Sequence, residues 1–392
     1  MNRPFDLRTY TFSGTSRQIG RQHGEALRTD IRRMVEGQLA GLEKAGISPE
    51  AFYEEFYAET GFLPAAEQWT PELVEMVRGI AEGTNLDFRP VFIFQLIDEL
   101  DWYFWRKNGA FSPAADNHCS VVGAFGGLVQ APILAQAPIL AAPILAQNAD
   151  MGKSVDGTGL LLHLKNTTTG METLTVTLPG LIGIYGLNRR AVGVCLNAMG
   201  LRMHKSTAGL GTLFVSQGIL GQGSFEEADR FVRSVPHATG EVYTIGSPHG
   251  MAVYECSANR VERYLPFDGA EEVYHTNHPL VNPDIELTPE VESRLSAEMQ
   301  ALLRRAGENT RIRLETLQRH MKELTPPLTV EKTKHILSAH DDPENPVCRH
   351  KRAESDAMTN FCMVMELGEP PVFHVASGPP CMTEFKTFHF DA

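Results

Sequence analysis

The chain has 392 residues, of which 42% are hydrophobic and 21% are charged, and its 35 Lys and Arg against 48 Asp and Glu give a net charge of −13. These fractions are typical of globular proteins and exclude collagen-like, coiled-coil and wholly disordered chains. An acidic chain without basic clusters is a poor ligand for nucleic acids or anionic membranes, so we expect neither as a partner. The length allows two or three domains, or one large α/β unit.

The six cysteines lie far apart in the sequence and include no CxxC pair. Their spacing fits neither a disulfide framework nor a zinc site, and it indicates a reducing compartment. The first residues, MNRPFDLRTYTF, contain no apolar core after the arginine and do not resemble a signal peptide. We therefore expect a cytoplasmic protein.

The first 110 residues predict helices that begin near Ser16, Pro49, Pro71 and Pro90. Proline at the first helical position and Gly or Asn after the last one are the expected start and stop signals. The polar stretch 107–118 is rich in helix breakers and predicts an exposed linker.

From Cys119 onward the hydrophobic period changes to that of strands. A hairpin is predicted around Gly126-Gly127, a helix over 221–235 with Ser224 as N-cap, and long charged helices over 289–323 and from about 330. Further strands are predicted over 159–163, 173–178, 182–185, 191–196, 242–245, 251–255, 260–264, 361–366 and 372–376. Helices, strands, helices and strands again indicate a layered α/β (α+β) fold rather than strict βαβ alternation.

Residues 131–147 form an almost perfect short repeat, APILAQ, APILA, APILAQ. Residues 117–149 contain no Asp, Glu, Lys or Arg, so a membrane-spanning helix has to be considered. Pro132, Pro138 and Pro143 would each destabilise such a helix by about 3 kcal/mol, and we therefore do not expect one. We interpret 131–141 as a tandem insertion at a hairpin, and the sequence assigns it no function.

Cys119 stands directly after the predicted linker, where a cut chain would begin with it. The new α-amine, with a pKa of about 7.7–8.0 in model peptides, would lie beside a thiol with a free pKa of about 8.5. One residue would then supply both nucleophile and base. Taken alone, Cys119 equally fits a small buried side chain at the start of a strand.

An ordered set of segments surrounds this cysteine. It comprises Ser16–Glu25, Met76–Gly83, Cys119-Ser120, Gln147–Asp150, Gly186–Asn188 with Gly193 and Asn197, His275–His278, Cys348-Arg349 and Glu354–Asp356. The set resembles the acyl-coenzyme A:6-aminopenicillanic acid acyltransferase (isopenicillin N acyltransferase) family of N-terminal nucleophile hydrolases, over nearly the whole chain.

The resemblance implies an αββα sandwich with a helical N-terminal part, and a precursor that cleaves itself before a nucleophilic cysteine. The scissile bond is then His118–Cys119, which divides the chain into 1–118, a helical α subunit, and 119–392, the catalytic β subunit. Such enzymes hydrolyse or transfer acyl groups at linear amide bonds. The two subunits come from one precursor, and assembly into a homo-oligomer stays open.

The resemblance also implies roles for four residues. Cys119 matches the nucleophile, Asp150 the acidic residue that orients the new amine and the substrate, Asn277 the donor to the oxyanion, and Arg349 an arginine near the active site that can pair with Asp150 or a substrate carboxylate. Without the family, Asp150 and Asn277 would fit turns or caps, and Arg349 a surface ion pair.

Three further residues, Tyr185, Asn188 and His278, lie in or beside the same segments, and we expect them to bind substrate. The chain departs from the family pattern at His118, where glycine is usual and adopts the strained peptide needed for an N-to-S acyl shift more easily. It departs again at Ala149, where an aromatic residue is common, and at the insertion 131–141.

The HTNH segment around Asn277 lacks the HExxH context of a zinc enzyme, and no second group of ligands has zinc spacing, so we expect no metal and no other cofactor. The glycine-rich stretch 209–223 contains neither a P-loop nor a GxGxxG motif.

The sequence therefore predicts a self-processing cysteine amidohydrolase or acyltransferase that acts on a small N-acyl compound through a Cys119 thioester. Because basic clusters are absent, hydrolysis is favoured over transfer from a coenzyme A thioester. Two alternatives stay open: an uncleaved binding or scaffold protein on the same fold, and a papain-like protease with Cys119, His275 and Asn277.

Overall fold

The structure is a computed structural model that describes residues 4, 6–44, 46–108, 118–125, 128–129, 139–140, 142–199, 202–267, 271–352 and 357–391. Most of the predicted linker, the turn at Gly126-Gly127, most of the repeat and the segment Glu354–Asp356 lie outside these residues.

The N-terminal part contains the helices α1 (Ser16–Ala26), α2 (Arg28–Lys44), α3 (Pro49–Glu59), α4 (Phe62–Trp69), α5 (Pro71–Thr84), α6 (Phe88–Ile93) and α7 (Ile97–Asn108). The remaining helices are α8 (Thr212–Leu220), α9 (Phe225–Ser234), α10 (Pro289–Glu292), α11 (Ala297–Glu323) and α12 (Val330–Leu337), with a 3₁₀ turn η2 (Lys153–Val155).

Among the described residues, the larger sheet has eight strands, in the order β1 (Arg8–Gly14), β6 (Leu160–Asn166), β7 (Glu172–Thr177), β8 (Tyr185–Asn188), β9 (Gly193–Ala198), β10 (Glu241–Ser247), β11 (Gly250–Cys256) and β12 (Val261–Tyr264). The smaller sheet has six, in the order β13 (Glu272–His275), β2 (His118–Ala124), β5 (Ile144–Gly152), β14 (Ala357–Glu366), β15 (Val372–Ala376) and β16 (Phe385–His389). A short separate ladder joins β3 (Leu128–Val129) to β4 (Ile139–Leu140).

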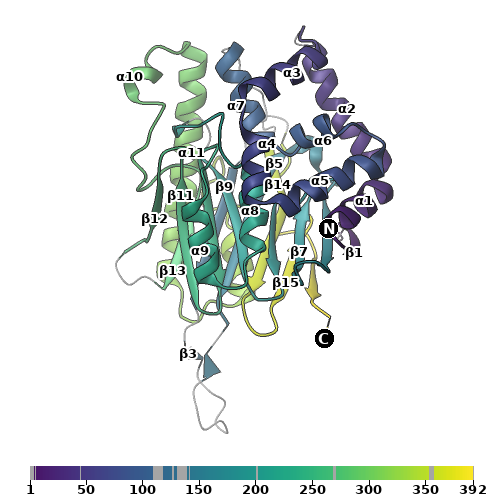
Figure 1. Cartoon of the computed structure of the whole chain (residues 1–392). Coiled ribbons are helices and arrows are strands. Elements are labelled where there is room, and N and C mark those ends of the chain that lie inside the picture. The colour runs from purple at the N-terminus through teal and green to yellow at the C-terminus, as the bar shows by residue number, and fades with distance from the viewer. Residues whose placement is uncertain are drawn as a thin grey trace.

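The two sheets pack face to face, and helices cover both outer faces. Gln147 of β5 crosses between the sheets, where its Oε1 accepts from the Leu196 N–H of β9 at 3.1 Å. Helices α8 and α9 lie over the larger sheet, and α11 and α12 over the smaller one (Figure 1). The predicted αββα sandwich is confirmed, with helices α1–α7 grouped at one side of it. None of the helices in the described ranges is both long and apolar enough to cross a membrane.

The chain departs from the predicted elements at several places. Residues Arg8–Gly14 form a strand that pairs in parallel with β6, so the N-terminal part contributes an edge strand to the larger sheet. The long charged segment divides into the short α10 and the 27-residue α11. Ser224 caps α9 as predicted, since its side chain accepts from Glu227 N–H, but the helix before it, α8, was not expected.

Strands β2 and β5 are antiparallel neighbours whose register joins His118 to Asp150 at one end, Cys119 to Ala149 next to it, and Ala124 to Ile144 at the other end. In sequence the insertion falls between Ala124 and Ile144, and β3, also between them, projects away from the sandwich (Figure 1). The pairing of Cys119 with its neighbours on β5 is therefore kept despite the repeat.

Helices α1 and α5 pack closely through glycines, which explains the two N-terminal segments of the resemblance. A Cβ at Gly20 would lie 1.9 Å from the Met76 carbonyl oxygen, and one at Gly79 would lie 2.1 Å from the Arg17 carbonyl oxygen. Backbone atoms cannot yield to such contacts as a flexible side chain can. The helix pair thus requires these glycines for its spacing.

The helix pair also fixes the loop that leads into β8. His23 of α1 is fully buried, and its Nε2 accepts from the Gly180 N–H at 3.2 Å, while burial lowers its pKa to about 4. Gln95 donates to the Gly180 carbonyl and accepts from the Ile182 N–H. This loop ends at Tyr185, so the N-terminal part positions a residue between the sheets.

Replacing Gly79 by Ala is expected to lower the free energy of unfolding by about 1–3 kcal/mol, because the added methyl overlaps the α1 backbone. Gly37→Ala is the matched control, since Gly37 lies on exposed α2 with no atom within 4 Å of an added Cβ. It should raise stability by about 0.5–1 kcal/mol. Urea unfolding of both variants measures the difference, and equal effects at the two sites would contradict the close helix contact.

Candidate active site

Cys119 is the second residue of β2, and its thiol lies between the two sheets. The side chain is 3% exposed, and Sγ lies 4.0 Å from the hydroxyl of Tyr185 on β8. Burial, and next the nearby Asp150 carboxylate, raise the pKa of this thiol to about 12. In the uncut chain Cys119 is therefore a protonated, enclosed thiol at neutral pH.

Two side chains hold the backbone of Cys119. Its N–H donates to Asn277 Oδ1 at 2.8 Å, and its carbonyl accepts from Arg313 Nη1 at 2.7 Å. Arg313 Nη2 also donates to the same Asn277 Oδ1 at 3.0 Å. The nitrogen of the predicted scissile His118–Cys119 bond and the carbonyl of the next peptide group are thus both fixed by side chains.

Arg313 was not anticipated from the sequence. It is fully buried on α11, and it also donates to Ser120 Oγ and Asn309 Oδ1, each at 2.9 Å. A buried guanidinium is tolerated only when its donors are paired, as these are. Its positive charge opposes the rise in the pKa of Cys119. The guanidinium that contacts Cys119 and Asn277 is that of Arg313, whereas the role expected of Arg349, pairing with Asp150 or a substrate carboxylate, stays a prediction.

A second network holds the segment that carries Asn277. The Asn277 N–H donates to Thr310 Oγ1 of α11 at 2.7 Å, and its Nδ2 donates to the Ala198 carbonyl at the end of β9 at 2.8 Å. The oxygen of the Asn277 amide, rather than its nitrogen, therefore faces Cys119 in this conformation.

His275 precedes this segment and is fully buried, with Nε2 2.8 Å from Glu255 Oε1 and Nδ1 2.9 Å from the Thr276 carbonyl. Both ring nitrogens are thereby engaged away from Cys119, so the Cys–His pair of a papain-like site does not form. Glu255 in turn accepts from three successive backbone N–H groups of the following loop, those of Leu280, Val281 and Asn282.

Asp150 lies beside Cys119, and the role expected of it, to orient the new amine and the substrate, stays a prediction. It is fully buried at the end of β5, opposite His118 in the β2–β5 register. Its backbone N–H bonds the Cys119 thiol, which opposes the rise in that thiol's pKa, and its Oδ1 accepts from the Thr359 hydroxyl at 2.6 Å.

Arg349 reaches this group through the same threonine. Its N–H donates to Thr359 Oγ1 at 2.9 Å, and its carbonyl accepts from the Thr359 N–H at 3.0 Å. Thr359 thus bridges the backbone of Arg349 and the Asp150 carboxylate.

The three expected substrate residues lie in different settings. Tyr185 faces Cys119, whereas Asn188, three residues further along β8, is turned to the helix layer. Its Nδ2 donates to the Leu220 and Gln222 carbonyls and its Oδ1 accepts from the Arg190 and Val192 N–H groups. Its amide is therefore occupied by backbone groups and stabilises the β8–β9 turn.

His278 is half-buried, with Nδ1 3.0 Å from Thr310 Oγ1. Burial, and next the neighbouring His275, lower its pKa to about 4, so the imidazole is neutral at physiological pH. It lies beside Asn277 in sequence and shares with it the hydroxyl of Thr310.

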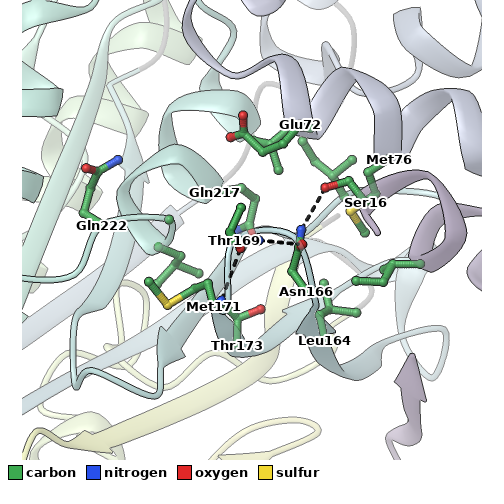
Figure 2. Close-up of a pocket in the computed structure, with 15 residues that line it drawn as sticks. Ser16, Glu72, Met76, Leu164, Asn166, Thr169, Met171, Thr173, Gln217 and Gln222 are labelled. Atoms are coloured by element: carbon green, nitrogen blue, oxygen red, sulfur yellow. Dashed lines mark hydrogen bonds between the residues drawn. The ribbon is translucent and has the colours of Figure 1, made fainter. Parts of the chain in front are cut away.

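A cavity of about 130 Å³ lies elsewhere, between α1, α5, α8 and the β6–β7 turn (Figure 2). Asn166 donates to Ser16 Oγ at 2.8 Å across it. Its lining contains one carboxylate, that of Glu72, and no Cys, His, Lys, Arg or Asp. The cavity is separate from the group around Cys119.

Residues 141–375 match the family of acyl-coenzyme A:6-aminopenicillanic acid acyl-transferase. A comparison with curated proteins finds no match. Among solved structures, the chain is similar to penicillin V acylase from Agrobacterium tumefaciens, with 10% identity and a TM-score of 0.37 over 71% of this chain and 79% of that one. A variant of conjugated bile acid hydrolase from Clostridium perfringens shows 10% identity and a TM-score of 0.32 over 70% and 90%.

Replacing Arg313 by Lys removes the fork that joins Cys119, Ser120 and Asn277, because one ammonium cannot reproduce its geometry. We expect the free energy of unfolding to fall by about 1–3 kcal/mol. Arg311→Lys is the control, since Arg311 is an exposed residue on the same helix that pairs with Glu315; it should change stability by less than about 0.5 kcal/mol. Denaturant titration compares them, and equal stability would contradict the bonding assigned to Arg313.

Proposed function

The chain belongs to the acyl-coenzyme A:6-aminopenicillanic acid acyltransferase family, and from this premise we propose that it is a self-processing cysteine amidohydrolase. Family membership makes it an enzyme of acyl transfer or amide hydrolysis. The finer proposal is that Cys119 becomes the N-terminal residue of a β subunit, 119–392, and carries the acyl group as a thioester.

The observation that carries the proposal is the fixation of the Cys119 peptide. Asn277 Oδ1 accepts the very N–H that cleavage before Cys119 would turn into an α-amine, and Arg313 holds the carbonyl of the same residue. Since both contacts lie on the Cys119 side of the bond, they can persist after the cut. The base generated by cleavage would then appear in an orientation already set.

Self-cleavage would proceed by an N-to-S acyl shift at His118–Cys119. Cys119 Sγ attacks the carbonyl carbon of His118, the C–N bond breaks as the nitrogen takes a proton, and water hydrolyses the resulting thioester. The products are a carboxylate on His118 and a free α-amine and thiol on Cys119. Asp150, opposite His118 in the register, supplies a carboxylate next to the new ammonium group.

Turnover would use the same atoms. The Cys119 α-amine takes the thiol proton as Sγ attacks the acyl carbonyl of the substrate, and the ammonium returns it to the departing amine. Water activated by the α-amine then hydrolyses the thioester and regenerates the thiol. An amine in place of water would give acyl transfer instead.

The tetrahedral intermediates need donors for their oxyanion. The Tyr185 hydroxyl faces Sγ and stays protonated, because burial raises its pKa well above the ordinary value. The family resemblance implies the Nδ2 group of Asn277 as a second donor, which requires the amide to turn, since in this conformation Nδ2 donates to the Ala198 carbonyl and Oδ1 faces Cys119. Both are neutral N–H or O–H donors that exchange no proton with the intermediate at physiological pH.

Burial of Cys119 supports the order of events. A thiol with a pKa near 12 and 3% exposure is a poor nucleophile toward a substrate from outside. Cleavage before Cys119 would add the α-amine as the base that this thiol lacks. The substrate in this proposal is a small N-acyl compound, and the acidic chain without basic clusters favours hydrolysis over transfer from coenzyme A.

Cys119→Ala is expected to leave the chain uncut and to lower the rate of amine release from a panel of N-acyl amines by about 10³-fold or more. Cys256→Ala is the control, because Cys256 is an equally buried cysteine, on β11; this variant should be cut and active. Release of free amine and denaturing electrophoresis are the two measurements. Hydrolysis by the uncut Cys119→Ala chain would refute the proposal.

A further inference from the structure

Four side chains with metal-binding atoms come together outside the group around Cys119. They are His340, Cys348, His350 and Cys381, and their ligand atoms all lie within 4.8 Å of one another. They come from three segments: the loop after α12, the approach to β14, and the connection from β15 to β16. No Asp or Glu belongs to the group.

The spacing of these atoms approaches that of a tetrahedral metal site. The two Nε2 atoms of His340 and His350 are 2.9 Å apart, the two Sγ atoms of Cys348 and Cys381 are 3.5 Å apart, and Cys381 Sγ lies 3.3 Å from His350 Nε2. Zinc at its usual distances, about 2.0–2.1 Å from nitrogen and about 2.3 Å from sulfur, would set such separations at about 3.3–3.8 Å. These three separations need to grow by only a few tenths of an ångström to admit the ion, and the other ligand atoms already lie within 4.8 Å of one another.

We propose that His340, Cys348, His350 and Cys381 bind one structural Zn²⁺. Two thiolates and two imidazoles are the ligands that zinc selects over magnesium or calcium. Because four protein ligands complete the tetrahedron, no position is left for substrate, and the site is structural rather than catalytic. Binding displaces the thiol protons of both cysteines, so two protons leave as the metal enters.

The surrounding backbone places the ligands without the metal. The Cys348 N–H donates to the Ala339 carbonyl, which brings the loop ends together beside His340. Asn148 of β5 donates from Nδ2 to the carbonyls of Leu337 and Val347, and so holds both sides of the same loop. Cys348 is buried while His340 and Cys381 are exposed, so the site opens to solvent and the ion can enter.

The metal would also stabilise the surroundings of Asp150. Arg349 lies between two of the ligands, and its backbone bonds Thr359, whose hydroxyl donates to Asp150 Oδ1. Fixing Cys348 and His350 fixes that backbone. Zinc thus acts through Arg349 and Thr359 as a positioning element.

The first test is the zinc content of the full-length chain, expressed without a polyhistidine tag in zinc-supplemented medium and purified without chelators. Mass spectrometry of the metal should give about one zinc per chain. Exposed Cys381→Ser and His340→Ala should each fall below about a tenth of that value. His335→Ala is the matched control, an exposed histidine on the adjoining helix that should keep about one zinc.

A second measurement uses cobalt as a probe. The chain reconstituted with Co²⁺ should show the visible absorption of a tetrahedral cobalt thiolate, and Cys381→Ser should lose it. Three results would overturn the proposal: a wild-type chain with less than about a tenth of a zinc, equal zinc in all variants, or a Cys348–Cys381 disulfide in the freshly purified protein. None of these readouts depends on whether the chain cleaves itself or hydrolyses an amide.

Discussion

The buried guanidinium of Arg313 is the contact on which the arrangement around Cys119 depends. It joins three parts of the chain, since α11 supplies it, β2 supplies the Cys119 carbonyl and Ser120 hydroxyl, and the segment after β13 supplies Asn277. A buried charge of this kind persists only while every partner stays in place. The same charge that fixes the Cys119 carbonyl also brings the Asn277 oxygen to the Cys119 N–H.

The second constraint is enclosure. The face-to-face sheets bury Cys119, and burial outweighs the Arg313 charge, so the thiol keeps its proton at neutral pH. The αββα sandwich therefore holds Cys119 as a protonated and almost fully buried thiol in the intact chain. The N-terminal helices contribute to it from a distance, because His23 and Gln95 hold the loop that ends at Tyr185.

Helix starts and the change from helices to strands could be predicted from the sequence, because single residues and the hydrophobic period mark them. Proline marked the starts of α3 and α5, Ser224 the start of α9, and the change of period the start of β2 at the predicted cleavage site. Proximity of Cys119, Asp150 and Asn277 also followed from the resemblance. Strand β1 was missed because only Phe12 of its seven residues is buried, so this edge strand has little hydrophobic pattern, and it stands beside a helical region. Arg313 could not be singled out from the sequence, because its helix contains several arginines. Asn309, one turn earlier, lies on the same buried face of that helix. The ligands around Cys348 were missed because they are spread over 41 positions, from His340 to Cys381, and only the folded loops bring them together.

The central claim, cleavage between His118 and Cys119, is tested most directly by the mass of the purified wild-type chain under denaturing conditions. We expect two pieces of about 13 and about 30 kDa, in proportion to 118 and 274 of the 392 residues in a 43.3 kDa chain, with Cys119 at the N-terminus of the larger one. A single chain of 43.3 kDa that hydrolyses N-acyl amines would contradict it.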